Sequence, residues 1–161
     1  MPTFFSPDGN PEIWDECPDG YLSPEEWAAA HPAPEPEPPT LDEARTEALA
    51  RLAAAFLAAE AAGRLMSSAG FVIDATERSN RDIEGLITSM EATGAPEAAF
   101  CAADNSFHTV TLEQLRAMRL EVIAYGQALY ARKWEVRTAI ERAGSVAEVQ
   151  AVDISFEGVG A

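Results

Sequence analysis

The sequence predicts a predominantly helical α+β protein with a small aromatic and acidic N-terminal module, a Pro-rich linker and a helical domain. Three observations support this fold class. Residues 111–144 include about thirty residues without proline, which is enough for one long C-terminal helix. Two pairs of short apolar segments flank turn-forming residues and predict two short β-hairpins. Alternating prolines at residues 32–39 separate these elements from residues 1–31.

The composition is that of a soluble globular protein, with 47% hydrophobic and 24% charged residues in a chain of 161. This length predicts one domain of ordinary size with a small appendage. The apolar runs are far shorter than the roughly 18 residues that a membrane span requires. Residues 1–7 lack the basic region and apolar core of a secretory signal, so we expect cytosolic synthesis and no membrane partner.

The net charge of −16 is unevenly distributed along the chain. Residues 1–44 contain eleven carboxylates and neither Lys nor Arg, so they contribute −11. Binding to nucleic acid requires clustered cations, so we expect no nucleic-acid partner. An acidic N-terminal third is compatible with solvation alone and with a basic protein partner, and the sequence leaves both readings open.

The N-terminal module, residues 1–31, combines many turn formers with a heavy aromatic load. A helix should begin at the Ser23 cap, because Pro24 and Glu26 follow at favourable positions, and should end near Ala30. So small a segment has little apolar mass to stabilise it. Its aromatic side chains therefore dock either on the rest of the chain or on another protein. The candidate partner-binding residues are Phe4, Phe5, Trp14, Tyr21 and Trp27.

Residues 32–39 predict an extended polyproline II spacer of about 3.1 Å per residue, kept solvated by two glutamates. A Pro-rich recognition ligand is the alternative. The helical domain, residues 40–156, opens with a capping box of Thr40 and Glu43, which predicts a helix to about residue 62. A hairpin of residues 64–67 and 71–74 should follow.

The second half of the domain should contain a helix, a hairpin and the long helix in that order. Ser79 is the expected start of the helix, which ends at Gly94. Residues 99–102 and 107–110 form the second predicted hairpin. A short terminal helix should begin at the Ser145 cap, and residues 157–161 are expected to fray.

The long helix carries two apolar lines. The first follows alternating steps of three and four residues with a break at Arg132, which indicates either a domain core or a self-association seam. Its members are Leu115, Met118, Val122, Tyr125, Leu129 and Val136. The second line runs along a neighbouring face, so we expect the helix to pack against more than one element. It consists of Leu120, Ile123, Tyr130 and Trp134.

The sequence offers no convincing catalytic, cofactor or metal site. Asp104, Ser106 and His108 have the residue types of a nucleophilic triad, but a single hairpin lacks the strained elbow and oxyanion donors that such chemistry requires. Cys17 and Cys101 have no second thiol or histidine at metal spacing. We therefore expect a protein that is not an enzyme and that needs no cofactor.

A series of short segments resembles one protein family in order and pattern. They are Ala-Ala-Gly at 61–63, Gly-Phe-Val-Ile-Asp at 70–74, Ser-Asn-Arg-Asp-Ile at 79–83, Phe-Cys-Ala-Ala-Asp-Asn-Ser-Phe-His-Thr-Val-Thr-Leu at 100–112, Ala-Arg-Lys-Trp at 131–134 and Ile-Glu-Arg-Ala at 140–143. From residue 41 to 152 the chain resembles a domain of uncharacterised function at the C-terminal end of bacteriophage tail-fibre-assembly and fibre-associated proteins. Residues 20–27 resemble the N-terminal portion of the same proteins.

The resemblance implies a phage protein that helps tail-fibre chains fold or trimerise in the bacterial host cytoplasm, or that stays on the fibre tip in the virion tail. It supplies no catalytic residues. We therefore expect an assembly chaperone whose N-terminal aromatic residues grip the fibre, with three copies on a trimeric fibre as the symmetric arrangement. A permanent structural component of the tail is the alternative. A hydrolase is a third class, but it would need paired carboxylates in a cleft.

Overall fold

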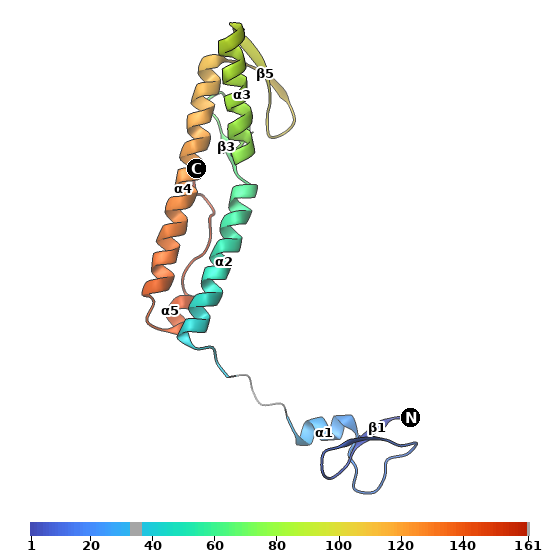
Figure 1. Cartoon of the computed structure of the whole chain (residues 1–161). Helices are drawn as coiled ribbons and strands as arrows, with labels where there is room; N and C mark the ends of the chain where they lie inside the picture. The colour runs from blue at the N-terminus through green and yellow to red at the C-terminus, as the bar shows by residue number, and fades with distance from the viewer. Residues whose placement is uncertain (33–36, 161) are drawn as a thin grey trace. The chain divides into compact units, whose positions relative to one another are not determined.

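The computed structural model describes residues 1–32 and 37–160, in two compact units, Met1–Pro38 and Pro39–Ala161 (Figure 1). We call them the N-terminal unit and the C-terminal unit. The predicted linker at 32–39 includes the boundary between them, but the extended conformation predicted for residues 33–36 lies outside the described residues.

The N-terminal unit contains a hairpin that the sequence analysis did not predict. Strand β1 (Thr3–Phe5) pairs antiparallel with β2 (Pro11–Ile13), and Phe5 also bridges to Leu22. Ser6 closes the loop between the strands, because its hydroxyl accepts a hydrogen bond from the backbone N–H of Asn10 at 3.1 Å. The paired strands thus give the aromatic residues a fixed backbone.

Helix α1 (Pro24–Ala30) begins as predicted at Ser23. The Ser23 hydroxyl accepts from the N–H of Glu26 at 3.2 Å, and the Glu26 carboxylate accepts from the N–H of Ser23 at 2.9 Å. Gly9, at φ +83°, is required near this helix, since a Cβ there would lie 3.1 Å from the Trp27 ring.

The C-terminal unit is mixed α and β, as predicted, and is built along one long helix. Helices α2 (Leu41–Ala61) and α3 (Glu77–Thr93) lie one after the other along α4 (Leu112–Arg142), and α5 (Val146–Gln150) follows at the far end of α4 (Figure 1). With 31 residues, α4 is about 46 Å long. Both flanking helices therefore pack against it in sequence.

The two predicted hairpins are confirmed, with small changes in length. Strand β3 (Arg64–Met66) pairs with β4 (Val72–Asp74), and β5 (Glu97–Cys101) pairs with β6 (Phe107–Thr111), both antiparallel. The second hairpin is longer than predicted, because β5 begins two residues earlier and β6 continues to Thr111, the residue before α4.

One predicted helix start needs correction, and one predicted cap has a different partner. Helix α3 is capped by Thr76 rather than Ser79, because Thr76 still has extended backbone and its hydroxyl accepts from the N–H of Ser79 at 3.2 Å. At α5 the Ser145 hydroxyl caps as predicted, but the Glu148 carboxylate accepts instead from the N–H of Gly144 at 2.7 Å.

The core of the C-terminal unit consists of two clusters of buried side chains on the two halves of α4. One joins α3 and the two hairpins to the N-terminal half, with Ile73, Ile83 and Val110 fully buried. The other joins α2 and α5 to the C-terminal half around Ile140. Near the end of α4, beyond the predicted stripe, Ile140 is fully buried.

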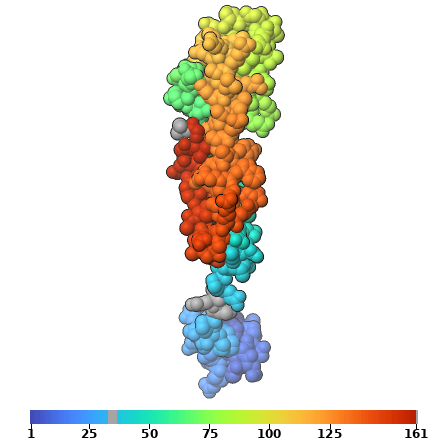
Figure 2. Space-filling model, turned by 90° about the vertical axis from the view of Figure 1, so that its left-hand side faces the viewer, coloured from blue at the N-terminus to red at the C-terminus, as the bar shows by residue number. Residues whose placement is uncertain are grey.

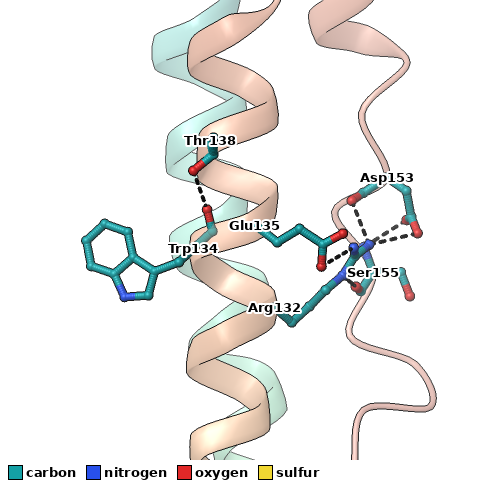
Figure 3. Close-up of polar contacts among 6 residues, drawn as sticks. All are labelled: Arg132, Trp134, Glu135, Thr138, Asp153 and Ser155. Carbon is teal, nitrogen blue, oxygen red and sulfur yellow. Dashed lines mark hydrogen bonds and ion pairs between the residues drawn. The ribbon is translucent and has the colours of Figure 1, made fainter.

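Arg132, the break in the predicted stripe, holds the segment after α5 in place (Figure 3). Its guanidinium donates to the backbone oxygen of Ser155 at 3.2 Å and pairs with the Asp153 carboxylate at 3.1 Å and with Glu135 at 3.4 Å. Residues 157–160, which we expected to fray, form a turn that ends with Gly160 against the Tyr125 ring.

We predict that Leu115→Ala lowers the free energy of unfolding by about 3 kcal/mol, because Leu115 is fully buried where α4 meets α3 and the hairpins. Leu57→Ala, the same change at an exposed position of α2, should have an effect below about 1 kcal/mol. Urea denaturation followed by circular dichroism measures both. Equal losses for the two variants would contradict this assignment of the core.

Candidate functional site

The aromatic residues of the N-terminal unit form two separate groups. The first is a stack of Phe5, Trp27 and His31, in which the ring centroids of Phe5 and Trp27 lie 5.1 Å apart and those of Trp27 and His31 lie 3.7 Å apart. Strand β1 supplies the first ring and α1 supplies the second, so this stack joins the hairpin to the helix. Phe5 and Trp27 are half-buried and serve as the small core of the unit.

The second group is the edge-to-face pair of Trp14 and Tyr21, whose centroids lie 6.3 Å apart. One carboxylate oxygen of Glu12 accepts from the Trp14 indole N–H at 3.2 Å and from the Tyr21 hydroxyl at 3.1 Å. Partial loss of water around the phenol, and next its bond to Glu12, raises the pKa of Tyr21. The hydroxyl therefore remains a donor at neutral pH, and both rings keep a defined orientation.

The five predicted partner-binding residues therefore differ in accessibility. Trp14 is 44% exposed, and its neighbour Ile13 is 65% exposed, whereas Phe4, Phe5, Tyr21 and Trp27 are half-buried. Sequence reasoning missed Glu12 and Ile13. The pairing of β1 with β2, which places Glu12 opposite Phe4, was the missing information. Residues 1–31 contain seven carboxylates and no Lys or Arg, so this aromatic surface is acidic.

The predicted apolar stripe of α4 packs inside the C-terminal unit. We call Leu115, Met118, Val122, Tyr125, Leu129 and Val136 the inner seam. All but Tyr125 are buried, and Tyr125 is half-buried with Gly63 and Gly160 close against its ring. The inner seam is therefore part of the core, where no second chain can reach it without opening the unit.

The second apolar line of α4 is exposed. Helix α4 does pack against more than one element, as expected, but α2 and α3 mainly bury the inner seam. Within the C-terminal unit, Leu120, Ile123, Tyr130 and Trp134 remain 67%, 38%, 50% and 58% exposed, although the Tyr130 ring also contacts Phe56 of α2, with centroids 4.9 Å apart. Figure 2 shows α4 as a continuous orange surface along the C-terminal unit, and Figure 3 shows Trp134 pointing away from Arg132. We call this line the outer face.

A depression of about 650 Å³ adjoins the outer face where α2, α3 and α4 meet. Ile123 and Tyr130 form one wall, and Leu57 and Asn80 lie on the opposite side. It is open to solvent and largely apolar near α4, so it extends the outer face toward α2.

The triad-like residues meet in an order that does not activate a nucleophile. The Ser106 hydroxyl donates to the Asp104 carboxylate, and His108 Nε2 lies 2.9 Å from the same hydroxyl oxygen. A catalytic triad needs the histidine between the acid and the serine, whereas here the serine lies between the other two. The Ser106 N–H also donates to Asp104 at 2.9 Å, and His108 stacks on Phe71 at 4.0 Å, so these contacts stabilise the turn.

Residues with metal-binding side chains lie apart from one another in residues 1–32 and 37–160. No group of three His, Cys, Asp or Glu residues there could hold a metal ion, and Cys17 and Cys101 are free thiols. None of the helices in that part of the chain combines the length and apolar character needed to cross a bilayer.

One family model matches the chain over residues 43–156, and its description is "Domain of unknown function (DUF4376)". This match covers most of the C-terminal unit and more than half of the chain, so the chain belongs to the DUF4376 family. No curated protein and no solved structure matches it significantly.

The Asp104 turn gives a pH-dependent prediction. The hydrogen bonds from the Ser106 hydroxyl and N–H lower the pKa of Asp104, so the ionised carboxylate adds stability above its unfolded pKa. That stability is lost as the pH falls through the lower folded pKa. The melting-temperature gap between wild type and Asp104→Asn should thus be present at neutral pH and close below pH about 3.9.

Asp19→Asn is the matched control, since the Asp19 carboxylate makes no hydrogen bond in the described part of the chain and should give no such closing gap. Differential scanning calorimetry across this pH range measures both variants. A gap for Asp104→Asn that stays constant into strong acid would contradict the turn assignment.

Proposed function

We propose that this member of the DUF4376 family is a non-enzymatic assembly factor for a phage tail fibre. In this proposal the N-terminal unit binds the fibre chain, and the protein promotes folding or trimerisation of the fibre in the host cytoplasm. The resemblance of residues 20–27 and 41–152 to tail-fibre-assembly proteins supports the identity of the partner. The chemistry of the N-terminal unit supports the mode of binding.

The observation that carries the proposal is the Trp14 and Tyr21 pair on Glu12. Two aromatic side chains at the surface of a very small unit are held in one orientation by a shared carboxylate. Rigid aromatic residues beside exposed apolar ones, here Ile13, are typical of binding hot spots, because little conformational entropy is lost on binding. The surrounding carboxylates favour a neutral or basic surface on the partner.

The physical need for such a factor follows from the nature of the fibre. Tail fibres are β-rich, intertwined trimers whose strands pair over long sequence distances, and such pairing is slow. Unpaired strand edges and apolar surfaces remain open to aggregation until the trimer closes. An acidic protein bound to one of these surfaces would keep the fibre chains soluble and apart until they meet their correct partners.

A permanent place on the fibre tip is the second candidate, and the same aromatic pair would serve it equally. The two functions differ in stoichiometry. Quantitative mass spectrometry of purified particles should show no copies of the chain for a transient chaperone and a fixed ratio to the fibre for a structural component.

The main test is co-expression of this chain with its proposed partner, a phage tail-fibre protein. We predict that Trp14→Ala lowers the yield of soluble fibre trimer severalfold, because it removes the exposed ring of the pair while leaving the Phe5 and Trp27 stack intact. Phe107→Ala, which removes an exposed ring from β6, should leave the yield unchanged.

Sedimentation of the fibre and circular dichroism of each variant separate lost binding from lost folding. The proposal would be rejected if the yield of soluble trimer were the same with wild-type chain, with Trp14→Ala and with no chain at all.

A further inference from the structure

The outer face of α4 has the spacing of a helix that pairs with another helix. Leu120, Ile123, Gln127, Tyr130 and Trp134 follow steps of three, four, three and four residues, which align on one side of a helix. The inner seam lies on nearly the opposite side of the helix. Val122 and Leu129, for example, lie between outer-face residues in the sequence but are buried. Helix α4 is thus apolar on two sides, and the C-terminal unit buries the inner seam while it leaves most of the outer face exposed.

The outer face is also free of charge. Residues 122–131 contain no Asp, Glu, Lys or Arg, although 24% of the chain is charged. A helix side that only meets water normally carries charged residues, and an exposed apolar stripe with polar ends marks an interaction site. Its ends are polar here, with Arg116 paired to Glu91 at 2.6 Å and Arg137 paired to Glu141 at 2.8 Å.

We propose that the outer face binds a second copy of this chain, with the two α4 helices side by side and parallel. This association does not depend on the fibre-binding function proposed above. A self-pairing helix meets its own residues across the symmetry axis, so each position must tolerate its own copy. Gln127 does so, because an amide carries both a donor and an acceptor and can pair with the amide of the other Gln127. Against an apolar segment of a different protein, the same amide would be left without a partner.

Small residues beside the stripe permit close approach. Ala117, Ala124 and Ala131 lie along one edge of the outer face, and Arg119 and Lys133 lie along the other. Parallel helices set unlike edges against each other, so the cationic edge of one copy meets the alanine edge of its partner. Antiparallel helices would set Arg119 near Lys133, and the like charges would repel.

The charge of the whole chain also favours this face as the contact. Two copies that each carry −16 repel one another, and they approach at least cost where neither surface is charged. Arg119 is already paired with Glu84 at 2.7 Å, and Lys133 lies over the Phe56 ring at 4.0 Å, so both cations beside the stripe have partners in their own chain.

The area available for this contact is small. Large side chains expose up to about 150–250 Å² each, so the exposed fractions of the four large apolar residues give roughly 400 Å² per chain. With Gln127 and the alanines, two copies would bury on the order of 1,000 Å², the lower limit for a specific interface. The dimer should therefore form in a concentration-dependent equilibrium.

Sedimentation equilibrium of the full chain over a wide concentration range tests the proposal. We expect the mass to rise from 17.3 kDa toward twice that value. Leu120→Glu with Tyr130→Glu places two charges on the outer face and should weaken association by about tenfold or more, or about 1.4 kcal/mol. Met66→Glu with Phe107→Glu, which changes two apolar residues on the hairpins that are at least as exposed, should associate like wild type.

Circular dichroism of both double variants verifies that the fold is retained. A wild-type mass of 17.3 kDa at every concentration would overturn the proposal, as would equal weakening by the two double variants. If the wild-type chain were monomeric and only the Leu120→Glu and Tyr130→Glu variant lost its effect on fibre yield, the outer face would bind the fibre and not a second copy.

Disulfide trapping tests the parallel orientation. In a chain with Cys17→Ser and Cys101→Ser, Leu120→Cys should form a disulfide-linked dimer with itself under mild oxidation, because parallel helices bring identical positions together. Trapping only in a mixture of Leu120→Cys and Trp134→Cys chains would show an antiparallel pair and overturn the parallel arrangement.

Discussion

The burial of the inner seam of α4 is the interaction on which the C-terminal unit depends. Neither α2 nor α3 has enough apolar surface to fold alone, and each buries its stripe against a different half of the same long helix. The hairpins and α5 close the two ends of this arrangement. Without a continuous α4, the unit would have two small cores in place of one connected structure, and each would be marginal.

Arg132 holds the irregular segment that follows α5 against α4. It occupies a seam position where an apolar side chain would be expected, and its guanidinium donates to backbone and side-chain oxygens of the segment after α5. These bonds hold Phe156 near Phe56, where the aromatic centroids lie 5.9 Å apart. A charged residue in the seam thus replaces one packing contact with several hydrogen bonds to a segment that lacks regular structure.

The sequence predicted the elements that are specified locally. The caps at Ser23 and Thr40 marked helix starts that the structure confirms, since cap and reciprocal residue lie within one turn. The β1 and β2 hairpin was missed because each strand has only three residues and Pro11 opens the second. The start of α3 was placed three residues late because Thr76 and Ser79 are both good caps, and only the end of β4 decides between them.

The candidate site was only partly predictable. The five aromatic residues of the N-terminal unit were identified from composition, but composition could not divide them into a core stack and an accessible pair. That division depends on how residues 1–31 fold, because the fold brings Tyr21, nine residues along the chain, to the same Glu12 carboxylate that Trp14 contacts. Likewise, both apolar lines of α4 were visible in the sequence, whereas only the positions of α2 and α3 show which line is buried.

The two apolar sides of α4 also affect what happens when the C-terminal unit opens transiently. If α2 or α3 separates from α4, part of the inner seam becomes exposed, and α4 then presents apolar side chains on two sides. Partly unfolded molecules of this kind aggregate at high concentration. The excess of carboxylates, eleven of them in residues 1–44, would keep such opened molecules apart through electrostatic repulsion. The acidic N-terminal third therefore limits aggregation of the whole chain through charge repulsion, which the long helix alone would not provide.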